Sequence, residues 1–473
     1  MRITIIGGGP GGYTAAFEAA RRGHAVTLVE NDSLGGTCLN RGCIPTKTLR
    51  SSADALALAR RLADYGLDGC PQPAPVLEAL RRRKENVIGI LRQGLEKTCG
   101  RLGVRLVRAT GRVRSAGLVL AEGSDGQEEI VGDAVIIATG SRVLELPGLP
   151  FDHTFICSSD DALDLASIPA RLLIVGGGVV GCEMACIYRA LGSDVTVIEG
   201  QDRLLPMPGV DEDISTLLAR EFRKQKIRLL TGRTLTGVTV ADGAVAGEAV
   251  PAPFAAPAAS ADAAAPVPLA GDMVLVTVGR LPVTEGLGLA DAGVAVDARG
   301  WVMVDEGFQT SVPGIYAVGD ILGPAHIMLA HAAAAEALCV VDTLCGAAHP
   351  MRYDAVPSAI FTSPEIGLVG LDEKEAARRG KIVCGLTQMR ELGKAQAMGE
   401  LAGFFKIVAA ADTGALLGAS IVGAHASDMI AEAGLALTAG LNVRQIAATI
   451  HPHPTLTEGF AEAAAAAVRQ LEA

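Results

Sequence analysis

Residues 2–30 read RITIIGGGPGGYTAAFEAARRGHAVTLVE, and this stretch decides the fold. It opens with a short β-branched run, Arg2–Ile6, which leads directly into a turn of consecutive glycines. An alanine-rich stretch with helical character follows, and a second strand-like run, Ala25–Glu30, ends in an acidic residue. The order strand, glycine turn, helix, strand and acid predicts a unit that binds a dinucleotide.

The same pattern occurs a second time, in residues 172–199, which read LLIVGGGVVGCEMACIYRALGSDVTVIE. Glu30 follows Gly12 by 18 residues, and Glu199 follows Gly181 by the same 18. A single glycine turn of this kind is weak support for a dinucleotide-binding unit, because glycine turns are common in unrelated strand–helix units. Two copies with the acid at equal spacing predict two dinucleotide-binding units in one chain.

The glycines and the acid of each copy have separate roles. The first glycine permits the tight turn, the second lets the backbone approach the pyrophosphate, and the third lets the helix pack close to the strand. The helix N-terminus then presents its N–H groups to phosphate. The acid accepts hydrogen bonds from ribose hydroxyls, and at the second copy it would repel a 2′-phosphate, which favours NAD over NADP. The predicted residues are Gly7, Gly9, Gly12 and Glu30 in the first copy and Gly176, Gly178, Gly181 and Glu199 in the second.

Length and composition limit the other possibilities. At 473 residues the chain suggests about three domains. A net charge of −11 and an aromatic content of 3% argue against a nucleic-acid-binding protein. We expect no signal peptide and no transmembrane helix, and therefore a cytoplasmic location. The ten cysteines are scattered, which makes a disulfide scaffold improbable.

Two further segments differ from the rest of the chain in composition or in sequence pattern. The tract 246–270 is rich in Ala and Pro, and we expect it to be a poorly ordered hairpin extension of the second unit. From about Met351 onward, alternating strands and helices continue without glycine fingerprints. This change predicts a separate α+β domain at the C-terminus.

Residues 35–47 read GGTCLNRGCIPTK and contain two cysteines, Cys38 and Cys43, at the start of a helix. Thiols at this spacing can approach within disulfide range. A helix N-terminus and the nearby Lys47 would lower a thiol pKa and provide a thiolate near neutral pH. No second Cys/His pair with metal-ligand spacing accompanies them, so we expect no metal site. The alternative is a pair of reduced structural thiols.

With this segment the sequence resembles the pyridine nucleotide-disulfide oxidoreductases, and among them the dihydrolipoamide dehydrogenases, over residues 1–465. The resemblance implies an α/β fold with two Rossmann-like domains, one for FAD and one for NAD, and a C-terminal α+β dimerisation domain. It places the FAD domain at 1–148 and 281–349, the NAD domain at 149–280 and the dimerisation domain at 350–473. It implies that FAD occupies the first glycine unit and NAD the second, and that Lys47 pairs with Glu183 near the flavin. It adds to the FAD site Gly36, Thr37, Lys47, Gly111, Thr139, Gly140, Asp320 and Ala330, and to the NAD site Gly279.

The octapeptide 451–458, HPHPTLTE, matches the second signature of the family. There, the histidine at the position of His453 is the acid–base, and the glutamate at the position of Glu458 orients it. A histidine titrates near neutral pH, and a carboxylate partner fixes its tautomer. His451 is the weaker candidate for the base, and an ordinary surface histidine is the alternative. We expect His326 and His331 to be packing or surface residues, and Cys182 and Cys186 to be small buried fillers.

The resemblance implies oxidation of protein-bound dihydrolipoyl groups, with reduction of NAD⁺, by a homodimer. The implied partner is a lipoyl domain of a 2-oxo acid dehydrogenase complex or of a glycine cleavage system. The alternatives are another NAD(P)H-dependent disulfide or flavin reductase of the family, a redox-regulatory flavoprotein without lipoamide turnover, and a scaffold subunit. One departure is Arg41, which stands where valine is common and could alter affinity for the acyl-carrier partner.

Overall fold

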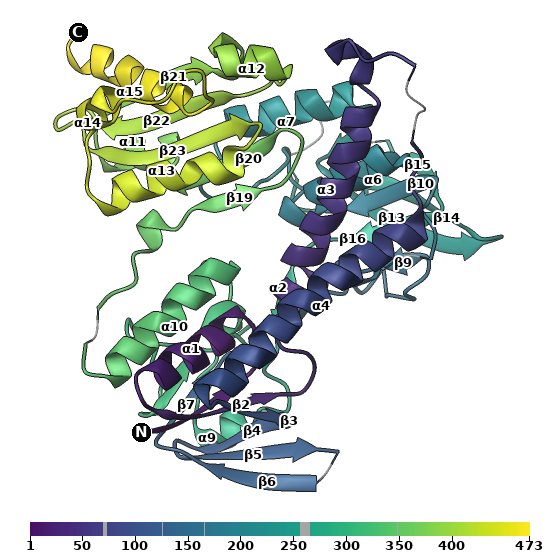
Figure 1. Ribbon diagram of the computed structural model, residues 1–473. Helices are drawn as coiled ribbons and strands as arrows, with labels where there is room; N and C mark the ends of the chain where they lie inside the picture. Colours follow the sequence, from purple (N-terminus) through teal and green to yellow (C-terminus); the bar gives the residue numbers. More distant parts are fainter. Residues whose placement is uncertain (70–72, 125, 165, 256–264, 348) are drawn as a thin grey trace.

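The computed structural model describes residues 1–69, 73–124, 126–164, 166–255, 265–347 and 349–473. A five-stranded parallel sheet, in the order β18-β7-β1-β2-β3, contains the first glycine unit (Figure 1). Helix α1 (Pro10–Arg21) connects the central strand β1 to its neighbour β2, and Pro10 at its first position has its φ already fixed for a helix. The alanine-rich α1 packs on α10 (Ala330–Leu344). The strands are β1 Arg2–Ile6, β2 Ala25–Glu30, β3 Arg105–Arg108, β7 Ala134–Ile137 and β18 Ile315–Ala317.

A second five-stranded parallel sheet, in the order β12-β11-β10-β16-β9, repeats this arrangement. Arg171 pairs with Asp194 in the second sheet as Arg2 pairs with Ala25 in the first, and α6 (Val179–Leu191) takes the place of α1. The two glycine units therefore have the same structure as well as the same sequence pattern. The strands are β9 Ile156–Cys157, β10 Arg171–Val175, β11 Asp194–Glu199, β12 Arg228–Thr231 and β16 Met273–Val276.

Each parallel sheet is accompanied by a three-stranded antiparallel sheet. In the second of these, β14 (Ala244–Pro251) pairs with β15 (Val267–Gly271), so the Ala/Pro tract is a hairpin connection as predicted. Residues 256–264 at its centre, where poor order is expected, lie outside the described residues. The other strands of this group are β4 Thr110–Ser115, β5 Leu118–Gly123, β6 Gly126–Val131 and β13 Arg233–Ala241, and a separate pair is formed by β8 Ser141–Val143 and β17 Arg280–Pro282.

The C-terminal part contains an antiparallel sheet in the order β19-β20-β23-β22-β21. Helix α13 (Ala426–Thr438) packs on β20 and β23, and α15 (Glu458–Leu471) packs on β21 and β22. This is the predicted α+β domain. Its strands are β19 Ser358–Ile360, β20 Glu365–Gly370, β21 Ile382–Gln388, β22 Phe404–Ala410 and β23 Leu416–Gly423, and its shorter helices are α11 Glu373–Arg379, α12 Gly393–Met398 and α14 Val443–Ala448.

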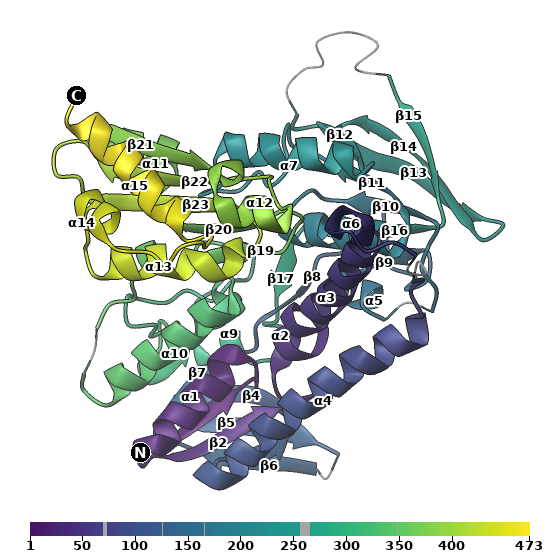
Figure 2. The same cartoon turned by 45° about the horizontal axis from the view of Figure 1, so that its top comes forward.

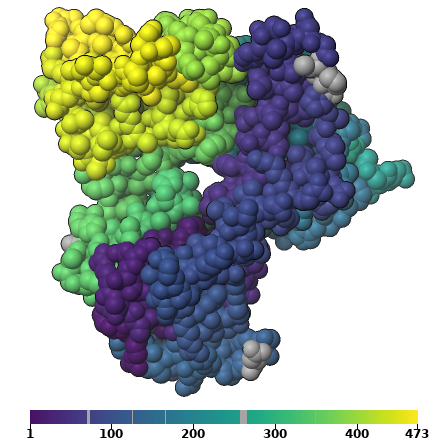
Figure 3. Space-filling view, in the orientation of Figure 1, coloured from purple at the N-terminus to yellow at the C-terminus, as the bar shows by residue number. Residues whose placement is uncertain are grey.

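Two long helices connect the first two parts. Helix α3 (Cys43–Ala59), which follows the short α2 (Gly36–Arg41), packs on α6 of the second unit. Helix α4 (Leu77–Leu102) packs on both α3 and α1. Figure 2 shows the pair extending from the first unit to the second, and Figure 3 shows the surface hollowed between the purple segment that carries α2 and α3 and the green segment that carries α10.

A buried lysine joins the second unit to the C-terminal domain. Nζ of Lys406, on β22, lies 3.0 Å from Asp211, 3.1 Å from Asp213 and 2.6 Å from Glu373. Asp211 and Asp213 stand at the N-terminus of α7 (Glu212–Lys224), and Glu373 begins α11. The Lys406 side chain is 7% exposed, and the surrounding carboxylates raise its pKa because they stabilise the ammonium form.

The three five-stranded sheets lie within the three predicted domain ranges, and where the domains divide stays a prediction. None of the helices in the described residues is long and apolar enough to cross a membrane.

Candidate active site

A cavity of about 670 Å³ runs from the first glycine turn to the two cysteines. It is bordered by the N-terminus of α1, by α2 and the first turn of α3, and by α6 of the second unit. All but one of the residues predicted for the FAD site line it, together with both cysteines and the predicted glutamate partner of Lys47. They are Gly7, Gly9, Glu30, Gly36, Thr37, Cys38, Cys43, Lys47, Gly111, Thr139, Gly140, Glu183, Asp320 and Ala330.

The remaining residue, Gly12, does not line the cavity but packs directly against the glycine turn that does. A Cβ atom on Gly12 would lie 1.8 Å from the carbonyl oxygen of Gly7, and one on Gly7 would lie 2.3 Å from that of Ala138. Gly7 also has a φ of +102°, which favours glycine. Because side chains are absent there, the backbone of the turn and the start of α1 are open to the cavity. This cradle fits the diphosphate of a dinucleotide.

The acid at the end of each unit is tied to its own glycine turn. Oε2 of Glu30 accepts a hydrogen bond of 2.6 Å from the N–H of Gly8, and Oε1 accepts one of 2.7 Å from Asp32. Burial raises the pKa of Glu30, while the N–H of Gly8 and the charges of Arg108 and Arg41 oppose the shift. Each carboxylate oxygen keeps a further lone pair for a ribose hydroxyl.

The second glycine unit has the same internal contacts. Glu199 accepts hydrogen bonds from the N–H groups of Gly177 and Gln201, as Glu30 does from Gly8 and Asp32. A Cβ atom on Gly181 would lie 1.9 Å from the oxygen of Gly176, whereas one on Gly178 would meet open space. Gly279, at a φ of +141°, follows strand β16, which pairs with the central strand β10. These residues do not line the large cavity, so the second unit offers a separate surface for a second dinucleotide.

The two cysteines are free thiols in direct contact, and their environments differ. Cys38 lies within α2, whereas Cys43 is the first residue of α3 and is exposed to the cavity. The Cys38 thiol donates a hydrogen bond to Cys43 and Lys47 adds a positive charge, which together lower the pKa of Cys43 to about 7. The same hydrogen bond, with burial, raises the pKa of Cys38. The predicted thiolate therefore belongs to Cys43 and not to Cys38.

The structure brings together Lys47 and Glu183, from α3 and α6. Nζ of Lys47 lies 2.9 Å from Oε2 of Glu183, whose Oε1 also accepts a hydrogen bond of 2.9 Å from the N–H of Phe361. The same ammonium group lies 4.2 Å from the centroid of the Phe361 ring, a cation–π distance. Sequence reasoning did not find Phe361, because no local pattern marks a residue that acts through its backbone N–H and its ring.

The loop before the cysteines is held by side chains that the sequence did not single out. The amide of Asn40 donates to the carbonyl oxygens of Leu34 and Gly36, and Arg92 of α4 donates to the Asn40 oxygen at 2.7 Å. Arg41, the residue that replaces valine, pairs with Asp32 and lines the cavity.

At the C-terminus, Nδ1 of His453 lies 2.8 Å from Oε1 of Glu458, and Oε2 of Glu458 accepts a hydrogen bond from the N–H of Thr455. These contacts lower the pKa of Glu458, because both stabilise its carboxylate. The His453 side chain is 76% exposed and does not line the cavity. In Figures 1 and 2, α15, which begins at Glu458, lies apart from α2, and His453 is not among the residues that line the cavity with the two cysteines.

The other candidate histidine, His451, has a different setting. Its Nε2 lies 2.8 Å from Glu432, and its side chain is only 7% exposed. Both histidines therefore have a carboxylate partner, but only His453 presents its ring to the outside.

The remaining histidines and cysteines of the sequence analysis have packing contacts. His326 hydrogen-bonds to Tyr353 and His331 to the carbonyl of Pro357, while Cys182 and Cys186 are buried. Within the described residues, no group of three or more His, Cys, Asp or Glu side chains is arranged to hold a metal ion.

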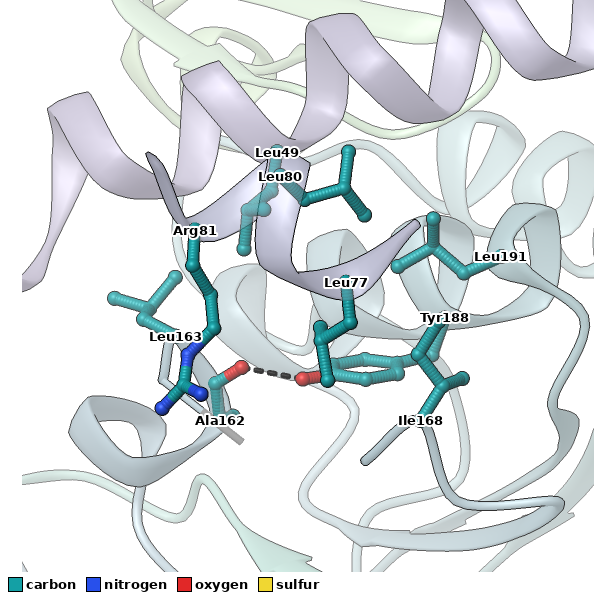
Figure 4. A pocket seen from close by; sticks show the side chains of 9 residues that line it. All are labelled: Leu49, Leu77, Leu80, Arg81, Ala162, Leu163, Ile168, Tyr188 and Leu191. Atoms are coloured by element: carbon teal, nitrogen blue, oxygen red, sulfur yellow. Dashed lines mark hydrogen bonds between the residues drawn. The ribbon is translucent and has the colours of Figure 1, made fainter. Parts of the chain in front are cut away.

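A second, much smaller cavity lies between α3, α4 and the second unit (Figure 4). Its volume is about 20 Å³, enough for a single water molecule. Leucines, an isoleucine and the ring of Tyr188 form most of its wall, and the Tyr188 hydroxyl donates to the carbonyl oxygen of Ala162. We regard it as a packing defect rather than a site.

Comparison with known proteins agrees with these features. The family model for pyridine nucleotide-disulphide oxidoreductases matches residues 1–337, and the model for the dimerisation domain of the same family matches residues 356–464. The chain is 38% identical to dihydrolipoyl dehydrogenase 3 of Haloarcula marismortui, over 98% of this chain and 95% of that one. It is 36% identical to the mitochondrial dihydrolipoyl dehydrogenase of Cricetulus griseus, over 98% and 90%.

Solved structures show the same likeness. LpdA from Mycobacterium tuberculosis superposes with a TM-score of 0.89 at 28% identity, over 98% of this chain and 99% of that one. The HOCl-induced flavoprotein disulfide reductase RclA from Escherichia coli gives 0.84 at 26% identity, over 98% of both chains. These matches confirm the fold, the dimerisation domain and the use of FAD and a pyridine nucleotide. The chain belongs to the pyridine nucleotide-disulphide oxidoreductase family.

Proposed function

We propose that this protein is a dihydrolipoyl dehydrogenase, which oxidises protein-bound dihydrolipoyl groups to lipoyl groups and reduces NAD⁺. The observation that carries the proposal is the pair of thiols lining the cavity, Cys38 within α2 and Cys43 at the start of α3 near Lys47, of which Cys43 has the lower pKa. A dithiol–disulfide exchange needs one sulfur that is attacked and another that leaves readily. A thiol with a low pKa is the better leaving group.

The exchange begins with Cys38 and Cys43 joined as a disulfide. His453 takes the proton of one substrate thiol, and the resulting thiolate attacks Sγ of Cys38. A mixed disulfide forms, the bond between the two cysteines breaks, and Cys43 leaves as the thiolate that its low pKa favours. The second substrate thiol then loses its proton and attacks the first substrate sulfur, which closes the lipoyl disulfide. Cys38 leaves and takes up a proton, so two electrons have passed from the substrate to the cysteine pair.

During this exchange the positive charge of Lys47 stabilises the Cys43 thiolate, and the ion pair with Glu183 fixes the position of Lys47. The cradle around Gly7 and Gly12 would hold the FAD diphosphate, and Glu199 would select NAD⁺ in the second unit. When bound, FAD supplies the two-electron chemistry that links the reduced cysteines to NAD⁺.

The position of His453 supports a site shared by two copies of the chain. The ring is exposed and does not line the cavity that contains the cysteines of its own chain. Two apolar side chains of the same domain, Leu435 and Ile450, are 69% and 95% exposed, as expected for a surface that a second copy covers. We therefore infer a homodimer in which His453 of one copy serves the cysteines of the other.

The lipoyl domain of a 2-oxo acid dehydrogenase complex or of a glycine cleavage system is the proposed partner, and the cytoplasm the proposed location. The test is steady-state formation of NADH from dihydrolipoamide and NAD⁺ by the purified protein, with NADP⁺ in a parallel assay. We expect rapid turnover with NAD⁺ and little with NADP⁺. Turnover with NADPH and another disulfide, or flavin binding without dihydrolipoamide oxidation, would favour one of the alternative flavoproteins.

A further inference from the structure

An exposed aromatic residue stands at the carboxyl edge of the second parallel sheet. Phe254, within the Ala/Pro tract, follows β14 by three residues and is 64% exposed. Strand β14 ends at this edge, because its last residue, Pro251, pairs with Arg233, the residue that begins β13 shortly after β12. Ligands of open α/β sheets bind at the carboxyl ends of the strands. Single exposed apolar residues are ordinary, however, so its contacts must decide whether Phe254 has a role.

Backbone hydrogen bonds tie the segment around Phe254 to the two strands that end beside it. The N–H of Ala252 donates to the carbonyl oxygen of Gly232, directly after β12, and the N–H of Gly232 donates to that of Gln201, just after β11. Ala252 is buried, and its carbonyl oxygen accepts a hydrogen bond from the N–H of Ala255, which closes a turn. The backbone that carries Phe254 is therefore fixed at the ends of β11 and β12.

The ring of Phe254 contacts the residue that follows the acid of the second glycine unit. A Cβ atom on Gly200 would lie 2.6 Å from Cζ and 2.8 Å from Cε2 of Phe254, so a larger residue there would displace the ring. Gly200 has no left-handed φ, which leaves this close approach as the reason for glycine. Cζ and Cε2 lie at the far end of the side chain. The contact therefore uses the tip of the ring, and most of its surface stays open.

The position of Glu199 indicates what the open surface would meet. The Glu199 carboxylate is fixed by the N–H groups of Gly177 and Gln201, and it is the predicted acceptor for the ribose hydroxyls of a dinucleotide. In adenosine the purine is attached to the ribose carbon next to the 2′-hydroxyl. A ribose held by Glu199 therefore has its adenine close to the neighbouring residue, Gly200, and to the ring that rests on it. Bases stack readily on exposed aromatic side chains.

We propose that Phe254 binds NAD⁺ by stacking on its adenine ring. The inference rests on the proposed function, because it adds a residue to the NAD⁺ site of the second unit. It gives the Ala/Pro tract a role that the glycine fingerprint does not contain, since the tract brings an aromatic ring to the acid. NADP⁺ carries the same adenine, so Phe254 strengthens the binding of both dinucleotides equally, whereas Glu199 distinguishes between them.

The experiment compares Phe254→Leu, which keeps an apolar side chain but removes the ring, with Phe254→Tyr, which keeps the ring. Binding of ADP to the FAD-loaded protein is measured by calorimetry, and kcat and KM are measured for NAD⁺ and NADP⁺. For Phe254→Leu we expect the Kd of ADP and both KM values to rise about fivefold to tenfold, as for one lost base–aromatic stack, with kcat unchanged. Phe254→Tyr should bind like the wild type. Val240→Ala removes another exposed apolar side chain from the same antiparallel sheet, and this control should change neither quantity.

Gly200→Ala tests the contact itself, because its Cβ atom displaces the ring without removing it. The substitution should weaken ADP binding in the wild type and add little in Phe254→Leu, where no ring is left to displace. Losses that simply add in the double variant would contradict the proposal. It is also wrong if Phe254→Leu leaves ADP affinity unchanged, or if the KM for NAD⁺ alone rises.

The wild type separates this proposal from the proposed function. A holoenzyme that binds ADP but does not oxidise dihydrolipoamide overturns the proposed function and leaves the stacking contact to be judged by the variants. A holoenzyme that oxidises dihydrolipoamide with NAD⁺, and whose ADP affinity is the same in Phe254→Leu, overturns the stacking contact alone. A holoenzyme that binds no ADP overturns the stacking contact as well as the NAD⁺ site.

Discussion

Lys47 and Glu183 form an ion pair of 2.9 Å that joins α3, the helix that begins at Cys43, to α6, the helix of the second glycine unit. The Glu183 side chain is 5% exposed, and its carboxylate is paired with Lys47 and accepts a hydrogen bond from the N–H of Phe361. Through this pair, a residue of the second unit controls the charge beside a thiol of the first. The site is therefore assembled by the contact between the two units.

Substitutions of this pair should move the pKa of Cys43 in opposite directions. Lys47→Met removes the positive charge that stabilises the thiolate and should raise the pKa above 7. Glu183→Gln removes a negative charge that opposes the thiolate and should lower it. The measurement is the pH dependence of iodoacetamide alkylation of Cys43 in the reduced protein, followed on the Cys43 peptide by mass spectrometry. Identical profiles for the two variants would contradict this account of Cys43.

Cys38→Ser should separate the two halves of the reaction. The variant lacks the sulfur that the substrate attacks, so dihydrolipoamide oxidation should be lost. NADH-driven reduction of an artificial electron acceptor does not use Cys38 and should continue. Both activities are measured on one preparation, and retained lipoamide turnover would show that Cys38 is not the sulfur attacked.

His453→Gln should lower kcat for dihydrolipoamide by roughly 10²- to 10⁴-fold, because a general base is lost, with little change in melting temperature. Glu458→Gln should have a smaller effect on kcat, since the histidine remains but is less well oriented. His451→Gln is the matched control. Its ring is buried against Glu432, so this variant should lose thermal stability. If His451→Gln lowered kcat as much as His453→Gln does, His451 and not His453 would be the general base.

The two equivalent glutamates should affect different dinucleotides. Glu199→Gln should raise the KM for NAD⁺ and reduce the preference over NADP⁺, because the charge that repels a 2′-phosphate is removed. Glu30→Gln, its counterpart in the first unit, should weaken FAD retention and leave the KM for NAD⁺ almost unchanged. If both variants changed only the KM for NAD⁺, the assignment of the two units would be incorrect.

Lys406→Met should destabilise the protein without touching the cysteines. The variant leaves three carboxylates facing one another where a buried ammonium group had been. We expect a loss of about 3 kcal/mol, at the low end for a broken buried ion pair because Asp213 and Glu373 are half-exposed. Lys374→Met, which removes an exposed pair with Glu212, is the control and should have little effect. Denaturant unfolding of the two variants checks this difference.

Much of the site could be predicted because its patterns are local. The glycines and the acid of each unit lie within a single strand–helix–strand segment, and Cys38 and Cys43 are five residues apart. The pairing of Lys47 with Glu183 came only from the family resemblance, since 136 residues separate them. No local signal marks Phe361, whose contacts with Lys47 and Glu183 arise from tertiary packing. The unequal pKa values of the two thiols likewise depend on a hydrogen bond and on burial that no spacing encodes.

The most direct test of the central claim is an anaerobic experiment in two additions, with the flavin absorbance of the holoenzyme recorded throughout. Addition of dihydrolipoamide alone should change the flavin absorbance, because the reduced cysteine pair lies at the flavin cavity, and subsequent addition of NAD⁺ should restore it with formation of one NADH for each dihydrolipoamide consumed. The account would be contradicted if dihydrolipoamide left the flavin absorbance unchanged, or if the reduced protein failed to form NADH.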